Sequence, residues 1–148
     1  MRRLVATIIV AQASCAEPSV EYPGPPELTL GVGEAALTPI QDGDAVPITK
    51  GPQGGTIVWG AVSARYLDPE QLELLFSIAP PDGTPSFRRV IVDLDDADGG
   101  FGVGLSLGHP VFLPDVDQFS GLPCVWRLEA TDREGRTAVD TKTVVPTQ

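Results

Sequence analysis

The densest group of side chains that could do chemistry is a run of four aspartates before two glycines: Asp93, Asp95, Asp96 and Asp98. Calcium takes about six to eight oxygen ligands, and aspartates on one turn could supply several of them. The spacing departs from the known calcium-loop pattern, because aligning its glycine on Gly99 puts Leu94 first and Leu105 last, where a glutamate is needed. We favour a solvated hairpin turn between strands at 87–94 and 101–107, with a weak calcium site as the alternative.

The chain has one histidine, His109, so any catalytic triad or histidine-based metal cluster depends on it. We expect it in a loop after a strand that ends at Leu107, where a lone histidine is ordinarily solvated. An enzyme would need His109 to lie in a pocket beside Ser106, Asp115 or Cys124, and no nucleophile-elbow pattern surrounds a serine. We therefore expect no enzymatic activity and no cofactor.

A glycine-rich segment, residues 51–55, leads into the strand that carries Trp59. A phosphate-binding loop would need a lysine and a helix after its glycines. Here Lys50 precedes the glycines and a strand follows them. The segment is instead interpreted as a tight turn, in which Gly54 and Gly55 allow backbone angles closed to other residues and which delivers Trp59 into the core.

Cys124 and the two tryptophans have simpler structural interpretations. Cys124 lies in an alternating strand, where a buried, unreactive thiol is expected, and a reactive thiol or a copper ligand is the alternative. Trp59 and Trp126 are expected to be core anchors of two sheets. Only an exposed pair of tryptophans would indicate a carbohydrate or peptide platform.

The elements that position these residues are short strands. Runs rich in Val, Ile, Leu and Thr are separated by clusters of Gly, Pro and Asp, and no long apolar pattern has a helical period. The pattern predicts strands at residues 28–32, 46–49, 56–65, 72–79, 87–94, 101–107, 124–131 and 136–145. Pro47 is consistent with an edge strand. Residues 68–75 have helical features at their start, and we expect a single turn that leads into a strand.

The last two strands are joined by a tight turn at residues 132–135, where Gly135 suits a left-handed backbone position. This hairpin and the regular spacing of the short strands resemble the immunoglobulin and fibronectin type III class. The resemblance implies an all-β, antiparallel two-sheet sandwich over residues 28–146. The chain lacks the cysteine pair of true immunoglobulin domains, because the strand at 56–65 holds no partner for Cys124.

The first fourteen residues resemble the signal peptide of a bacterial lipoprotein. Arg2 and Arg3 precede a short apolar run, and small residues precede Cys15. The apolar run is too short to span a membrane. The resemblance implies that cleavage makes Cys15 the new N-terminus and that this cysteine carries the lipid, although Gln12 stands where the family favours leucine. The glycine-rich segment at 51–55 is also similar to that of uncharacterised bacterial lipoproteins with one such domain, which implies no activity.

A second cleavage interpretation remains open. Residues 11–13 also fit ordinary secretory cleavage, which would free the chain at Ser14 and make a disulfide between Cys15 and Cys124 conceivable. Cleavage there gives an unusually short signal peptide, so lipidation is the favoured interpretation. Ala16 follows the cysteine in place of aspartate, which by the enterobacterial sorting rule favours the outer membrane.

Residues 15–27 form a proline-rich tether between Cys15 and the sandwich. Proline fixes φ and removes a backbone donor, so such a segment is expected to be extended and solvated, at about 3.1 Å per residue. About ten residues would hold the domain roughly 30 Å from the lipid.

The acidic composition limits the partners. The full chain has a formal net charge of −10, and cleavage before Cys15 would leave eight basic residues against twenty acidic ones, a charge of −12. Such a surface repels phosphate backbones, so no nucleic-acid binding is expected. The sequence therefore predicts a lipid-anchored envelope protein outside the cytoplasm, a non-enzymatic binding or structural module with a protein partner, or alternatively a calcium-binding module.

Overall fold

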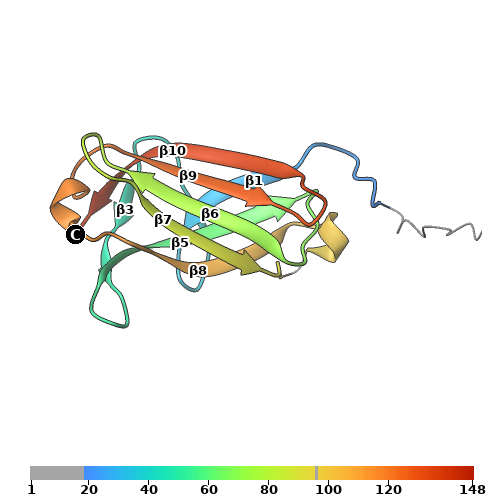
Figure 1. Ribbon diagram of the computed structural model, residues 1–148, viewed down its shortest axis with the longest axis horizontal. Coiled ribbons are helices and arrows are strands. Elements are labelled where there is room, and N and C mark those ends of the chain that lie inside the picture. The colour runs from blue at the N-terminus through green and yellow to red at the C-terminus, as the bar shows by residue number, and fades with distance from the viewer. Residues whose placement is uncertain (1–18, 96) are drawn as a thin grey trace, which may run out of the picture.

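Two β-sheets packed face to face form a sandwich in the structure, a computed structural model that describes residues 19–95 and 97–148 (Figure 1). The first sheet contains β1 (Glu27–Val32), β2 (Thr38–Pro39), β4 (Thr49–Lys50), β5 (Thr56–Arg65) and β8 (Gly104–Phe112). The second contains β3 (Ala45–Pro47), β6 (Leu72–Ala79), β7 (Ser86–Val92), β9 (Cys124–Thr131) and β10 (Thr137–Thr147). The expected all-β, two-sheet sandwich is confirmed. The leader, Cys15 and Asp96 lie outside the described residues.

The strand order leaves two edges on the same side of the sandwich. The second sheet runs β3–β10–β9–β6–β7, so β7 is an edge strand. In the first sheet β8 pairs only with β5, and β7 and β8 contact each other along this side. All pairs are antiparallel except β3 with β10, where Val46 lies opposite Pro146 in a parallel edge pairing. Two single-turn 3₁₀ helices, Asp98–Gly100 and Val116–Gln118, complete the described elements, and no helix among these residues has the length and apolar character needed to cross a membrane.

The core lies between the sheets and follows from the two-residue period of the strands. Residues of β9 alternate between buried and half-exposed, and Trp126 is the largest fully buried side chain. On the opposing sheet, Val58 and Val62 point inward from β5. Gly60 lies between them, and a Cβ added there would come within 2.8 Å of the Phe76 ring. The absence of a side chain at Gly60 therefore lets Phe76 of β6 fill the centre of the sandwich.

The two predicted turns are confirmed. The turn between β9 and β10 contains Gly135 at φ +78°, a conformation that favours glycine. The glycine-rich segment joins β4 to β5 as a tight turn: Gly54 has φ +84°, and the amide of Gly51 donates to the carbonyl of Gly55 at 2.6 Å. Residues 68–75 form no helix but a turn that leads into β6, as expected.

One hairpin and two strands were predicted wrongly. The expected strand at 46–49 is two short strands, β3 and β4, which belong to different sheets. Residues 93–100 do not close a hairpin, because β7 and β8 belong to different sheets and the segment crosses between them. β8 begins at Gly104 and continues to Phe112, past the expected end at Leu107. Gly108 adopts φ +71° where the pairing with β5 shifts register, which lets the strand bend and continue. Proline is tolerated further along β8 because this is an edge strand.

Candidate functional site

A shallow hollow of about 360 Å³ on the outer face of the first sheet is the candidate functional site. It is lined by Pro52, Gln53, Trp59, Arg88, Pro110 and Phe112. Trp59 of β5 lies opposite Pro110 of β8 in the sheet register, and Phe112 follows two residues later on the same face. Gly55 makes room for Phe112, because a Cβ there would lie 2.9 Å from its ring. Three segments far apart in the sequence thus meet in one mostly apolar depression.

The two tryptophans have different environments. Trp126 is fully buried, as predicted, whereas the prediction that Trp59 is a core anchor was wrong. Trp59 is half-buried on the outer face, because the inner positions of β5 are Val58, Gly60 and Val62. The sequence holds no clear signal for this face, because residues 57–62 are apolar on both faces of β5 and Ile57 and Ala61, on the same face as Trp59, are fully buried.

Arg88 is the one charged side chain that lines the hollow. It comes from β7 of the second sheet, is exposed, and forms no ion pair with a described residue. The hollow therefore combines two aromatic rings and two prolines with a cation that has no counter-ion among the described residues. Such a surface suits an apolar group with a carboxylate beside it.

His109 is buried in β8, and the prediction of a solvated loop residue was wrong. Its side chain is only 7% exposed, its ring lies 5.3 Å from that of Phe76, and its Nε2 lies 2.8 Å from the Ser106 hydroxyl. Burial, and secondarily the charge of Arg88, lowers the pKa of His109. Of the proposed catalytic partners only Ser106 reaches it. Asp115 instead accepts a hydrogen bond from Gln118, so the described residues assemble no Ser-His-Asp arrangement.

We expect His109 to make the protein less stable in mild acid. Above the ordinary pKa of histidine, about 6.5, both the folded and the unfolded chain hold it neutral. As the pH falls below that value, the unfolded chain binds a proton that the folded chain rejects, so the free energy of unfolding decreases. Urea unfolding of the wild type and of His109→Gln at pH 7.5 and 5.5 would measure this. An equal loss of stability in both proteins would contradict it.

Cys124 has the buried thiol that the sequence predicts. It is fully buried at the start of β9 and is the one cysteine among the described residues. Its Sγ donates to the Phe119 carbonyl at 3.7 Å, and burial raises the pKa of the thiol. A raised pKa keeps the thiol protonated and weakly nucleophilic. The structure thus favours an inert residue over a reactive one.

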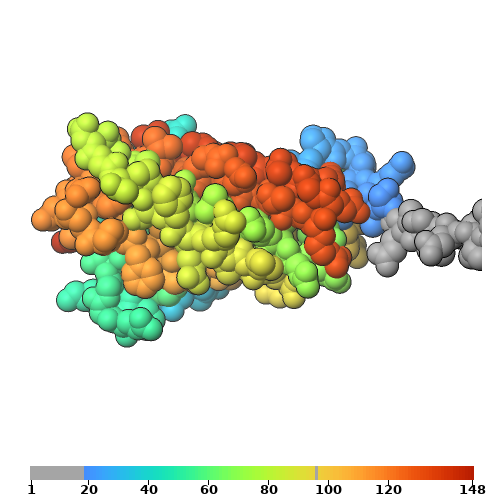
Figure 2. All heavy atoms as spheres, in the orientation of Figure 1, coloured from blue at the N-terminus to red at the C-terminus, as the bar shows by residue number. Residues whose placement is uncertain are grey.

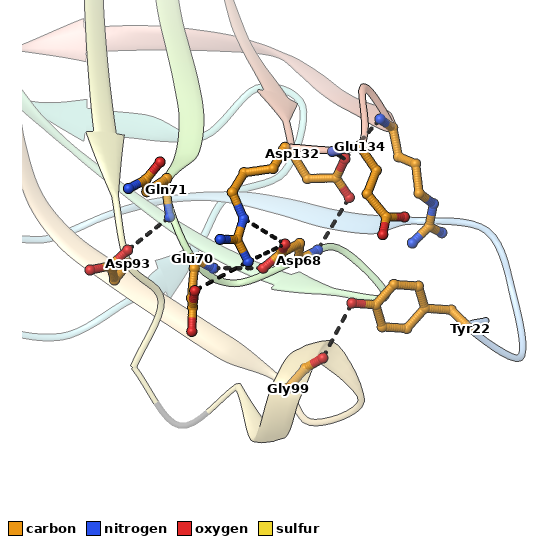
Figure 3. Close-up of polar contacts among 10 residues, drawn as sticks. Tyr22, Asp68, Glu70, Gln71, Asp93, Gly99, Asp132 and Glu134 are labelled. Carbon is orange, nitrogen blue, oxygen red and sulfur yellow. Dashed lines mark hydrogen bonds and ion pairs between the residues drawn. The ribbon is translucent and has the colours of Figure 1, made fainter. Parts of the chain in front are cut away.

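The described aspartates of the proposed calcium turn are not gathered around a common point. Asp93 accepts a hydrogen bond from the Gln71 amide at 2.8 Å (Figure 3), Asp95 pairs through its backbone with Leu105, and Asp98 begins a 3₁₀ helix. Across residues 19–95 and 97–148, no group of three His, Cys, Asp or Glu side chains could hold a metal ion. Calcium binding therefore stays a prediction from the sequence alone.

A carboxylate that the sequence analysis missed organises the end of the sandwich where the chain enters. Asp132 is 5% exposed and accepts hydrogen bonds from the backbone amides of Glu134 (3.0 Å), Arg136 (2.8 Å) and Asp68 (3.2 Å). Next to it, the Arg133 guanidinium contacts Asp68 at 2.7 Å (Figure 3). This network ties the β9–β10 turn to the connection between β5 and β6. The signal for it was the aspartate at the first position of a turn.

Tyr22 packs against the same end of the sandwich, although it lies within the segment 15–27 that was expected to be solvated. Its hydroxyl donates to the Gly99 carbonyl at 3.2 Å (Figure 3), its ring lies 5.1 Å from that of Phe101, and the Arg136 guanidinium stacks 4.5 Å above it. Gly100 leaves room for this contact, because a Cβ there would lie 2.7 Å from the tyrosine oxygen. An aromatic residue in a proline-rich segment was the overlooked signal for docking.

Comparison with sequence models of protein families, with curated proteins and with solved structures gives no significant match.

Proposed function

We propose that this chain is a lipid-anchored envelope protein whose immunoglobulin-like sandwich is a non-enzymatic module that binds another protein. The observation that carries the proposal is the position of the hollow relative to the N-terminal segment. Tyr22 docks at one end of the sandwich, where Glu27 lies opposite Arg65, whereas the hollow lies toward the other end of β5, beside the turn that precedes Thr56. Ten residues of strand span about 30 Å.

The leader supplies the argument for the anchor. If Cys15 carries the lipid, the end of the sandwich with Tyr22 faces the membrane and the hollow faces away from it. An apolar depression that faces away from the membrane is accessible to another protein. The charge of Arg88 at its rim favours a partner with an apolar side chain next to a carboxylate.

The strand order supports the immunoglobulin-like class. In that class one sheet contains strands A, B and E, and the other contains C, F and G, to which a C′ strand can be added. Here β1, β5 and β8 follow the first order, and β6, β9 and β10 follow the second, with β7 in the place of C′. Such domains commonly act in recognition rather than catalysis, a likeness of fold that adds only modest support.

Photo-crosslinking in intact cells tests the proposal. A photoreactive amino acid at Phe112 should give a discrete, partner-sized adduct in the membrane fraction, because this exposed side chain lines the hollow. The matched control is the same amino acid at Thr141, an exposed position on β10 of the other sheet, which should give none. A Cys15→Ser variant should leave the membrane fraction. Adducts absent at Phe112, or equal at both positions, would contradict the binding site, and a membrane-bound Cys15→Ser variant would contradict the anchor.

A further inference from the structure

The outer edge of β7 is free to accept another strand. Among the described strands β7 pairs only with β6, and none of its residues makes a further backbone hydrogen bond across that edge. Along these seven residues of extended backbone, every second residue therefore presents an unpaired N–H and C=O at one side of the sandwich, where β7 lies at the surface (Figure 2).

The side chains of β7 are unusually apolar for an exposed edge strand. Phe87 and Ile91 are 63% and 65% exposed, the highest values among the exposed large apolar side chains. They stand at alternate positions with Arg89 between them, so all three project from the outer face of the second sheet. Their neighbours on β6 are Ser77 and Glu73, which leave the two apolar side chains uncovered.

The charge of β7 is opposite to that of the whole protein. Arg88 and Arg89 are adjacent and exposed in a chain whose net charge is −10. Arg89 contacts Glu73 at 3.5 Å through largely exposed side chains, an ion pair that contributes little, and Arg88 has no ion pair among the described residues. A strand that arrives at this edge would therefore find a cation on either face, Arg89 on the outer face and Arg88 on the side of the hollow.

Charge also argues against a second copy of the chain as the occupant. A symmetric antiparallel pair of β7 strands centred on Arg89 would place the two Arg89 side chains directly opposite each other, which is destabilising. Two molecules of charge −10 also repel each other before contact. The complementary occupant is an acidic segment of a different protein.

We propose that the free edge of β7 binds an extended segment of a partner protein by strand addition, and that this segment carries an acidic residue between two apolar residues at alternate positions. Its apolar side chains lie opposite Phe87 and Ile91, its carboxylate lies opposite Arg89, and main-chain hydrogen bonds supply the remaining affinity. The inference rests on the proposed function, since it states the form and chemistry of the partner of the same module. Arg88 joins the two surfaces, because it stands on β7 and lines the hollow.

Fluorescence anisotropy with labelled heptapeptides tests the strand addition. A peptide with glutamate between two valines at alternate positions should bind the folded protein, and its lysine analogue should bind at least about five-fold more weakly. Arg89→Glu should reverse this preference. The matched control is Lys50→Glu, which makes the same charge change on an exposed residue of the first sheet and should leave the preference as it is.

Backbone methylation separates strand addition from charge attraction. Two further versions of the glutamate peptide carry N-methyl groups on every second backbone amide. One version is methylated along one edge of the extended peptide, and the other version along the opposite edge. One of the two should lose binding, because its methyl groups face β7, and the other should keep it. The inference would be overturned if neither unmodified peptide binds, if Arg89→Glu has no effect, or if both methylated peptides bind equally. A dimer in sedimentation that Arg89→Glu abolishes would also overturn it, because the edge would then bind a second copy of the chain. Adducts at Phe112 in cells would still support the proposed function in each of these cases.

Discussion

Replacement of Asp132 with alanine is expected to lower the free energy of unfolding by about 3–5 kcal/mol, because three backbone amides lose a charged acceptor at once. The carboxylate is almost fully buried, so water cannot replace it without opening the turn between β9 and β10. The third amide, that of Asp68, belongs to a segment 64 residues away in the sequence. The loss should therefore loosen the β5–β6 connection as well as the turn.

Urea unfolding followed by tryptophan fluorescence measures this effect. Asp132→Asn keeps a carbonyl acceptor and should lose less stability than Asp132→Ala. Asp117→Ala serves as the control, since this exposed aspartate makes no hydrogen bond or ion pair in the described structure, and it should change the free energy of unfolding by less than about 0.5 kcal/mol. An Asp132→Ala protein as stable as Asp117→Ala would show that the network at this end is not needed.

Replacement of Trp126 with alanine is expected to cost about 3–5 kcal/mol, the usual range for removing a large aromatic side chain from a core. Trp126 is the largest fully buried side chain and lies between Cys124 and Leu128 on the inner face of β9. Its indole Nε1 is buried without a hydrogen-bond partner among the described residues. Trp126→Phe should therefore cost markedly less than Trp126→Ala, because it retains the ring and gives up no hydrogen bond.

Trp59→Ala is the matched control for this prediction. The same pair of residue types is exchanged on the outer face of β5, where the side chain is half-buried, so the loss should be roughly 1–2 kcal/mol. Thermal unfolding followed by far-ultraviolet circular dichroism compares the three variants without depending on the deleted fluorophores. Equal losses for Trp126→Ala and Trp59→Ala would contradict the placement of the two tryptophans.

The sequence was most informative where burial has a strict period. In residues 124–131 every second side chain is apolar, because one face of an antiparallel strand lies on the core and the other meets solvent, and the structure reproduces this pattern. The turn at Gly135 was equally predictable, since few residues other than glycine adopt its backbone angles.

The remaining features depend on contacts that no local pattern encodes. Residues 93–100 have the composition of a hairpin turn, yet the chain crosses here from one sheet to the other. Packing between the two sheets, and not the local sequence, decides which sheet the next strand joins. His109 is buried because β8 continues past Gly108 and places its ring against Phe76 of the other sheet, which the loop-like residues around it could not indicate. The hollow and the Asp132 network both join segments that are distant in sequence.

The register of β1 has a mechanical consequence. Glu27 pairs with Arg65 and Val32 with Gly60, so the chain enters the sheet parallel to the long axis that separates the end with Tyr22 from the hollow. If Cys15 is anchored as proposed and a partner is held at the hollow, tension between the two would load this six-residue ladder lengthwise, in shear. Its hydrogen bonds, which run across the strands, would then have to rupture together instead of unzipping in turn.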